Sequence, residues 1–281
     1  MKVKNKLPLT TESFNYARKR LLDFGRNFTD DASIHGIRGE AYITNTLTGE
    51  VIFKKNKIIL PGSMLIASKL FDVAPDFITP SYNIALGLDQ STTSVIESTD
   101  RQKVYLFAVG TDGITPSGTI ADVDYSKWID PDNLVPLRMV MPTNDLSEAD
   151  RSLYYGRKYR DDYILYYFKT FDRDPNLIIE YEDGTPVDSN VYTSSNPTDI
   201  KVYVELRFSI TKADCREYFM NTVGIADAKI SSISLLTAEP TTGSDGFIYY
   251  QNIRPLTKLN ISEEKLDDLD KGLDITYDII L

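Results

Sequence analysis

The sequence predicts a mainly β protein, with antiparallel sheets in a β-sandwich or jelly-roll-like arrangement, a few short helices and long extended loops. The clearest observation is the segment Lys201–Thr211, where apolar and polar residues alternate as in a strand with one buried face. Further runs of strand-forming residues are separated by Gly, Asn and Pro turns. The chain also holds 18 Tyr and 12 Phe, which favour strands and also suit a surface that contacts other proteins.

Residues 1–32 are expected to form an N-terminal arm and a helix. The arm is basic, with Lys2, Lys4 and Lys6, and it has no apolar pattern of its own, so we expect it to become ordered on binding an acidic neighbour. Apolar residues at helical spacing then predict a helix from about Glu12 to Phe24.

Residues 33–125 are expected to form a first β region. Two strand-like runs, Glu40–Asn45 and Val51–Lys55, flank a short turn whose Gly49 can adopt a positive φ, which predicts a hairpin. A basic tip follows, with Lys54, Lys55 and Lys57 as candidate interface residues. Ser63 is expected to cap a helix that ends at Phe71. Further strands are expected near Tyr82–Leu86 and Lys103–Val109.

Residues 126–160 are predicted to be an extended loop excursion over the surface, with a helical turn or two at Asp145–Arg151. Its candidate interface residues are Tyr154, Tyr155, Arg157 and Lys158, which combine aromatic anchors with charge.

Residues 161–281 are expected to form a second β region that packs with the first as one large domain. The acidic run 263–270 after Ser262 is interpreted as the start of a short exposed helix. The strands are expected at Tyr163–Phe171, Asn176–Tyr181, Lys201–Thr211, Ile230–Thr237 and Asp274–Leu281.

The order of parts over about residues 36–110 resembles a group of virion structural proteins of tailed bacteriophages. The resemblance rests on the "TGEV" hairpin at 48–51, the "KN.I.LPG" motif at 55–62, and "NIALG" at 83–87 before a Ser/Thr-rich loop. It implies a structural subunit that forms a ring or adaptor at the neck, collar or tail, or a tail-completion or baseplate component. Such a protein is made in the cytoplasm of the bacterial host and ends up in the virion. The implied partners are portal or adaptor proteins, tail or collar subunits, and further copies of the chain in a homo-oligomeric ring.

The alternative function is a host-recognition or carbohydrate-binding module of a baseplate or decoration protein. In such modules aromatic side chains stack on sugar rings. They usually rely on exposed Trp, and the only Trp in this chain is Trp128.

Composition and motifs argue against other classes. A net charge of −10 disfavours direct nucleic-acid binding, which needs a concentrated excess of Lys and Arg. The single Cys215 allows no intrachain disulfide and no cysteine-based zinc cluster. No apolar stretch approaches the roughly 20 residues of a membrane span, so no membrane partner is expected.

Catalytic motifs are absent from the sequence. The chain has one histidine, His35, and no nucleophile-elbow, phosphate-loop or dinucleotide motif, so we expect no enzyme activity and no cofactor. The pairs Asp122/Asp124 and Asp172/Asp174 lack the Gly and the closing Glu of an EF-hand loop, so we interpret them as turn caps rather than as a metal site.

Overall fold

A computed structural model describes residues 38–71, 78–81, 92–95, 101–124, 126–181, 183–187, 200–268 and 270–281. Its strands are β1 (Arg38–Asn45), β2 (Val51–Ile58), β3 (Ile78–Ser81), β4 (Thr92–Val95), β5 (Lys103–Gly110), β6 (Leu134–Val135), β7 (Arg138–Val140), β8 (Tyr154–Arg160), β9 (Tyr163–Thr170), β10 (Asn176–Tyr181), β11 (Ile200–Ile210), β12 (Lys229–Thr242), β13 (Ile248–Pro255), β14 (Thr257–Lys265) and β15 (Leu273–Ile280). Its helices are α2 (Leu60–Phe71), α3 (Glu148–Arg151) and α4 (Arg216–Thr222), with 3-10 turns η1 (Pro131–Asn133), η2 (Pro142–Asn144) and η5 (Ile225–Asp227).

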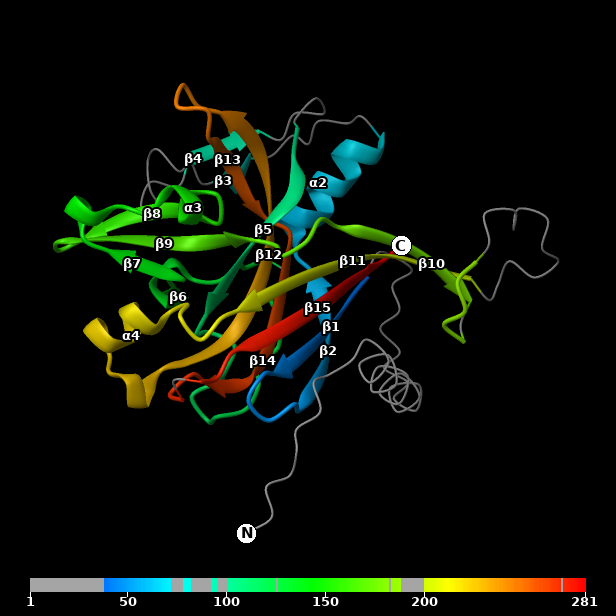
Figure 1. Cartoon of the computed structure of the whole chain (residues 1–281). Coiled ribbons are helices and arrows are strands. Elements are labelled where there is room, and N and C mark those ends of the chain that lie inside the picture. Colours follow the sequence, from blue (N-terminus) through cyan, green and yellow to red (C-terminus); the bar gives the residue numbers. More distant parts are fainter. Residues whose placement is uncertain are drawn as a thin grey trace, which may run out of the picture.

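One curled antiparallel sheet dominates the described part of the chain (Figure 1). It has thirteen strands, and its main order is β10-β11-β15-β1-β2-β14-β12-β5-β9-β7. Strands β13, β6 and β8 pair with β12, β5 and β9, while β3 and β4 form a separate two-stranded sheet. The predicted class, mainly β with antiparallel strands and few short helices, is confirmed. Strands from both predicted β regions are neighbours in this one sheet, as β1 and β15 show.

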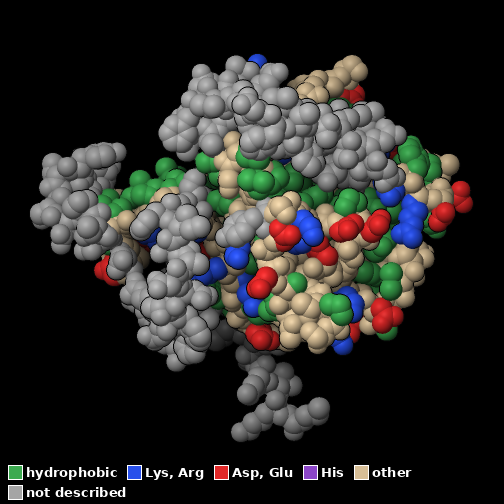
Figure 2. All heavy atoms as spheres, turned by 180° about the vertical axis from the view of Figure 1, so that it is seen from behind, with side chains coloured by type: hydrophobic (Ala, Val, Ile, Leu, Met, Phe, Trp, Pro, Cys, Tyr) green, Lys and Arg blue, Asp and Glu red, His purple; other side chains and the backbone are tan. Residues whose placement is uncertain are grey.

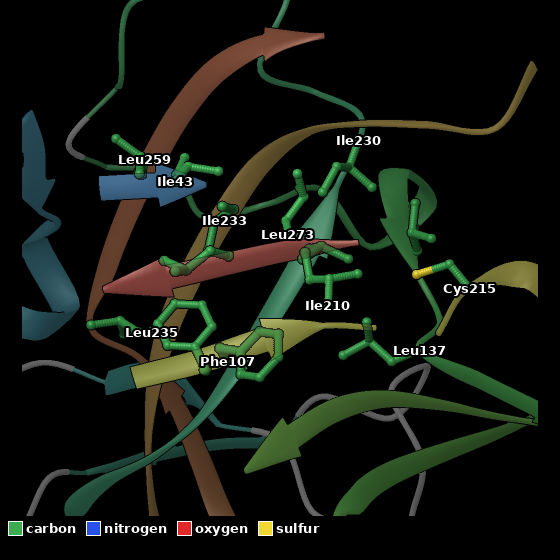
Figure 3. Close-up of a cluster of buried hydrophobic side chains, with 14 of the residues drawn as sticks. Ile43, Phe107, Leu137, Ile210, Cys215, Ile230, Ile233, Leu235, Leu259 and Leu273 are labelled. Atoms are coloured by element: carbon green, nitrogen blue, oxygen red, sulfur yellow. The ribbon is translucent and has the colours of Figure 1, made fainter. Parts of the chain in front are cut away.

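Side chains fill the inside of the curl (Figure 3). Phe107 on β5 and Phe208 on β11 stack with their ring centroids 4.4 Å apart, although the two strands are far apart in the sheet order. Ile43, Ile233 and Leu259 belong to the same buried cluster. Each of these large side chains contributes about 1.5–3 kcal/mol when fully buried. The sheet therefore curls because its apolar inner face packs against itself.

Strand β5 is buried on both faces, and this creates a second cluster. Phe107 and Val109 face the inside of the curl, whereas Leu106 and Ala108 pack with Phe168 and other side chains on the opposite side. All four β5 residues have an exposed fraction of 0%. The second cluster holds β8, β9 and β13 together.

Most of the predicted strands are confirmed. The β1–β2 hairpin forms, and Gly49 has φ +73. The segment predicted at Lys201–Thr211 is β11, Ile200–Ile210, and its residues Leu206, Phe208 and Ile210 are buried as expected. The predicted strand at Tyr82–Leu86, the helix from Glu12 to Phe24, and His35 lie outside the described residues.

The prediction that the other face of β11 is wet is wrong for its first half. Tyr203 has an exposed fraction of 0% and Glu205 one of 6%. The Nε of Arg207 lies 2.7 Å from the Glu205 carboxylate, so the charge of this buried side chain is partly balanced. Alternation in the sequence identified the strand, but it did not reveal that both of its faces are covered.

The predicted extended loop over 126–160 is wrong at 134–135 and 138–140, which form β6 and β7 of the main sheet, and at 154–160, which form β8 along almost the whole length of β9. The predicted helical turn near Asp145–Arg151 is found as α3, which Ser147 caps by accepting from the amide of Asp150. The segment Tyr154–Arg160 lacks an apolar-polar alternation because burial changes along the strand: Tyr154 and Tyr155 are buried in two different core clusters, whereas Tyr159 and Arg160 are exposed.

The predicted exposed helix at 263–270 is also wrong, because β14 continues to Lys265 and pairs with β12. Lys229 lies 2.9 Å from the Glu263 carboxylate, and Lys271 lies 3.1 Å from that of Glu264. One lysine on the neighbouring strand β12 and one in the connection to β15 therefore balance the acidic charge of this strand.

The predicted cap at Ser63 is wrong as well, since α2 begins at Leu60. Pro61 lies in the first turn, where a missing N–H costs nothing. Gly62 lies so close to the Leu256 carbonyl oxygen that an added Cβ would be 2.2 Å from it. The helix therefore starts where its first turn packs against the bend between β13 and β14.

Candidate binding surfaces

Three of the predicted interface residues, Tyr154, Tyr155 and Arg157, line an open hollow with a volume of about 520 Å³. They come from β8. The opposite wall is the tip of the β12–β13 hairpin, from Thr241 and Phe247 to Gln251, and the segment before and in α3 closes one end. The complete lining is Asp145, Leu146, Arg151, Tyr154, Tyr155, Gly156, Arg157, Tyr166, Thr241, Phe247, Ile248, Tyr249, Tyr250 and Gln251. We call this hollow the tyrosine pocket.

Aromatic rings form the floor of the tyrosine pocket. Tyr155 and Tyr250 meet edge to face, with centroids 4.4 Å apart and an interplanar angle of 89°. Both are buried, and burial raises the pKa of each phenol above its ordinary value, so both hydroxyls stay protonated at neutral pH. The Tyr155 hydroxyl donates to the Ser152 carbonyl at 2.9 Å. The hydrogen bond of Tyr155 and its ring contact with Tyr250 therefore hold the floor in place.

Asp145 organises the charged rim. Its carboxylate accepts from the Tyr166 hydroxyl and, at 2.7 Å, from the Leu146 amide. It also lies 3.6 Å from a guanidinium nitrogen of Arg157 and 3.9 Å from one of Arg151. Partial burial raises the pKa of Asp145, but these hydrogen bonds and positive charges outweigh it and lower the pKa below its ordinary value. Asp145 is thus ionised at neutral pH and holds both arginine side chains at the rim.

Gly156 determines how β8 passes the pocket. Its φ is +70, and a Cβ there would lie 2.4 Å from a ring carbon of Phe168. Only glycine combines this backbone conformation with so close an approach. It therefore lets β8 lie directly against the ring of Phe168.

The fourth predicted residue of this group, Lys158, lies at a different hollow. It lines a space of about 320 Å³ together with Arg160, Tyr167, Tyr218, Leu134, Pro131 and Asp132. The predicted patch on β8 is therefore divided between two hollows rather than forming one continuous surface.

The predicted interface residues Lys54, Lys55 and Lys57 lie on β2. In the sheet order β2 is separated from β8 by β14, β12, β5 and β9. Lys55 and Lys57 are exposed and Lys54 is half-buried. Lys2, Lys4 and Lys6 lie outside the described residues. The structure does not bring the β2 lysines to the tyrosine pocket. On the face shown in Figure 2, the basic and acidic side chains of the described residues are interspersed.

A second kind of surface is the edge strand β10, which extends away from the body of the sheet (Figure 1). Leu177 has an exposed fraction of 59% and Ile179 one of 41%. They stand opposite Val204 and Val202 of β11, on the face that continues into the buried core at Leu206. The apolar face that is buried in the core along β11 is therefore exposed to solvent at β10.

Sequence reasoning missed a buried ion pair behind the pocket. The Lys169 ammonium lies 2.7 Å from the Asp214 carboxylate, and the exposed fractions of the two side chains are 5% and 0%. Asp214 also accepts from the Tyr154 hydroxyl at 2.5 Å and from the Thr211 amide at 2.9 Å. These groups satisfy one another, so the network fixes Tyr154 and the start of α4 rather than forming a reaction centre.

Sequence reasoning also missed the tip of the β12–β13 hairpin. The segment 242–250 reads Thr-Gly-Ser-Asp-Gly followed by Phe-Ile-Tyr-Tyr, a turn signal before a strand-like aromatic run, and this signal predicts a hairpin. Trp128, the platform expected for carbohydrate recognition, is half-buried instead. Its indole N–H donates to the Ser234 hydroxyl at 2.6 Å.

Among the described residues, no group of three or more His, Cys, Asp or Glu is placed to hold a metal ion. Asp124 accepts from the amide and the hydroxyl of Ser126, at 2.9 and 2.7 Å, as the predicted turn cap should. None of the described helices has the length and apolar character needed to cross a membrane.

No family model, curated protein or solved structure matches this chain.

Proposed function

We propose that this protein is a structural subunit of a tailed-bacteriophage particle. It forms a ring or adaptor at the neck, collar or tail, and it acts through protein–protein contacts rather than catalysis. The resemblance over residues 36–110 supports the phage assignment. The mainly β fold and the sequence's lack of catalytic motifs agree with a structural role.

The observation that carries a contact function is the edge strand β10. Around Ile179–Tyr181 the outer edge of β10 already pairs with residues 185–187 of the same chain, so the contact is made by the exposed apolar face of the strand. Exposed apolar surface of this kind marks sites of protein–protein contact. Here Leu177 and Ile179 are exposed on the core face of the sheet. A neighbouring subunit that covers this face extends the core across the interface.

The proposed occupant is a second copy of the chain in a ring. A contact between β10 of one copy and a different surface of the next is heterologous, and heterologous contacts close into rings when the rotation allows. Portal, adaptor, tail or collar proteins then contact the ring through its other surfaces.

The test has two steps. First, purified particles of the phage whose genome encodes this chain are analysed by mass spectrometry, and we expect the protein to be present in a fixed copy number. Second, Leu177→Asp and Ile179→Asp are introduced. Because both side chains are exposed, the variants should keep the melting temperature of the wild type but fail to oligomerise and to enter particles.

Asn176→Asp is the matched control. Asn176 is exposed on the same strand but on the opposite face, so its variant should assemble normally. Absence of the wild-type protein from purified particles would refute the phage assignment. Normal incorporation of Leu177→Asp and Ile179→Asp would refute the contact at β10.

A further inference from the structure

We propose that the tyrosine pocket is a binding site for an acidic saccharide, in which sugar rings lie against the tyrosines and a carboxylate binds Arg157 and Arg151. This inference goes beyond the structural role and does not depend on it. It also gives the alternative function, carbohydrate recognition, a specific site in place of Trp128.

The size and composition of the pocket fit a small ligand. Its volume of about 520 Å³ falls within the roughly 300–1,000 Å³ of ligand sites, which are mostly apolar with a few placed polar groups. Six aromatic side chains line it: Tyr154, Tyr155, Tyr166, Phe247, Tyr249 and Tyr250. Flat aromatic faces suit the apolar C–H face of a sugar ring.

The aromatic walls differ in how firmly they are held. Tyr155 and Tyr250 form the buried floor, whereas Tyr249 stands at the rim with an exposed fraction of 37%. The rim ring is therefore available to a ligand, and replacing it does not disturb the core.

Most of the tyrosine hydroxyls in the pocket donate their hydrogen bonds to other groups of the protein. Four of these hydroxyls donate to protein acceptors: Tyr154 to Asp214, Tyr155 to the Ser152 carbonyl, Tyr166 to Asp145 and Tyr249 to Asp245. The donors of the lining that remain for a ligand are the hydroxyls of Thr241 and Tyr250, the Gln251 amide and the guanidinium N–H groups of the two rim arginines. The arginines are the charged donors among these, so a negatively charged acceptor suits the pocket.

Arg151 and Arg157 have donors to spare. Each guanidinium has five N–H donors. They share one carboxylate, Asp145, at 3.9 and 3.6 Å, and that carboxylate already accepts from a tyrosine hydroxyl and a backbone amide. Arg151 donates once more, to the Leu146 carbonyl at 3.3 Å. Both arginine side chains are 42% exposed, so a ligand can reach them.

The charged residues that line the pocket favour an anion over a cation. Two arginines and one aspartate line the pocket, an excess of one positive charge in a chain whose net charge is −10. Asp245 lies outside the lining, where it accepts from Tyr249 and from the Phe247 amide, and the positive charge of Arg151 contributes to the lowering of its pKa, so Asp245 offsets part of this excess. A carboxylate binds arginine through paired N–H···O bonds, which gives the site both charge and geometric selectivity.

The experiment measures binding of purified full-length protein to named probes by ligand-observed NMR and calorimetry. The acidic probes are glucuronic acid, galacturonic acid and N-acetylneuraminic acid. Glucose and galactose test the need for the carboxylate, and benzoate tests the need for the sugar. Titration to about 20 mM saturates a ligand with a Kd near 1 mM. We expect saturable binding of at least one acidic sugar, at least about tenfold tighter than its neutral counterpart or benzoate.

Two variants test the residues. Arg157→Gln should weaken binding of the acidic sugar by about tenfold to a hundredfold, because it removes a charged hydrogen-bond partner. Tyr249→Ala should weaken it by removing a ring from the rim. The matched control is Arg160→Gln, on the same strand but outside the tyrosine pocket, which should bind like the wild type.

Several results would overturn the proposal: no saturable binding of any acidic sugar, equal binding of neutral sugars or benzoate, or unchanged binding by folded Arg157→Gln. Each is measured on the free protein. Assembly of the β10 variants is scored separately in particles, so failure here leaves the structural function standing, and the reverse also holds.

Discussion

The buried pair of Lys169 and Asp214 should be among the most sensitive points of the fold. Their charged atoms are 2.7 Å apart, and the exposed fractions of the side chains are only 5% and 0%. At an effective dielectric constant of about 20, the gross attraction is about 6 kcal/mol. Desolvation of the two ions cancels much of this gain. Removing one partner leaves the other buried without its counter-charge, so Lys169→Met or Asp214→Asn should each lower the free energy of unfolding by about 3–5 kcal/mol.

A double-mutant cycle in urea or guanidinium denaturation measures the effect. The double variant should lose clearly less stability than the sum of the two single variants, because it leaves no unbalanced charge. The pair of Lys212 and Asp270 is a matched control from the same part of the chain. It has the same chemistry at 3.3 Å, but its side chains are 62% and 75% exposed.

The corresponding changes at the control pair should cost less than about 1 kcal/mol, the range of surface salt bridges. If Lys169→Met is no more destabilising than Lys212→Met, or if the two buried changes are simply additive, the assignment of this pair as a coupled structural network is incorrect.

Three further predictions concern the core, the rim and β8. Leu206→Asp buries a charge and should cost several kcal/mol by thermal melting; Glu205→Ala should also be clearly destabilising, since Glu205 is 6% exposed. Partial burial raises the pKa of Asp145, but its hydrogen bonds and arginine neighbours lower it overall. The ionised Asp145 therefore stabilises the fold above about pH 3.9, and this stabilisation is lost as the pH falls through the lower pKa of the folded state. Asp145→Asn should thus be less stable than the wild type at pH 7, and the difference in melting temperature should shrink below about pH 4. Gly156→Ala should destabilise the protein more than Gly184→Ala. Both glycines have a positive φ, but only the Cβ added at Gly156 would clash with a buried side chain, 2.4 Å from a ring carbon of Phe168. Equal melting temperatures of the two variants would contradict this.

The sequence alone predicted the strands that have a local signal, either an alternation of apolar and polar residues or a recognisable turn. β11 was predicted within one residue at each end because Val202, Leu206 and Phe208 recur every second position, and the β1–β2 hairpin because Gly49 marks its turn. Strand β14 was missed because acidic residues at 263–264 are poor strand formers. Their charges are balanced in the fold by Lys229 on the neighbouring strand β12 and by Lys271, which follows β14 in the chain.

Only the β8 side of the candidate site could be predicted from the sequence. Tyr154, Tyr155 and Arg157 were identified as aromatic and charged residues in one segment. Their partners on the hairpin tip are about 90 residues further along the chain, and no local pattern connects the two segments. The same holds for Lys169 and Asp214, whose positions differ by 45. Contacts of this kind depend on how the sheet curls, and single-sequence patterns carry no information about that.

The second buried cluster links the fold to the site, and it separates the residues that build the pocket from those available for recognition. Tyr155 and Tyr250 belong to the same cluster as Leu106 and Phe168, so the pocket floor is also the packing that holds the β12–β13 hairpin against β8 and β9. A change in the floor should therefore alter stability and binding together. Arg157 and Tyr249 lie outside that cluster, at the partly exposed rim. Rim variants can lose binding without unfolding, and for this reason they are the changes that discriminate a ligand site from a packing defect.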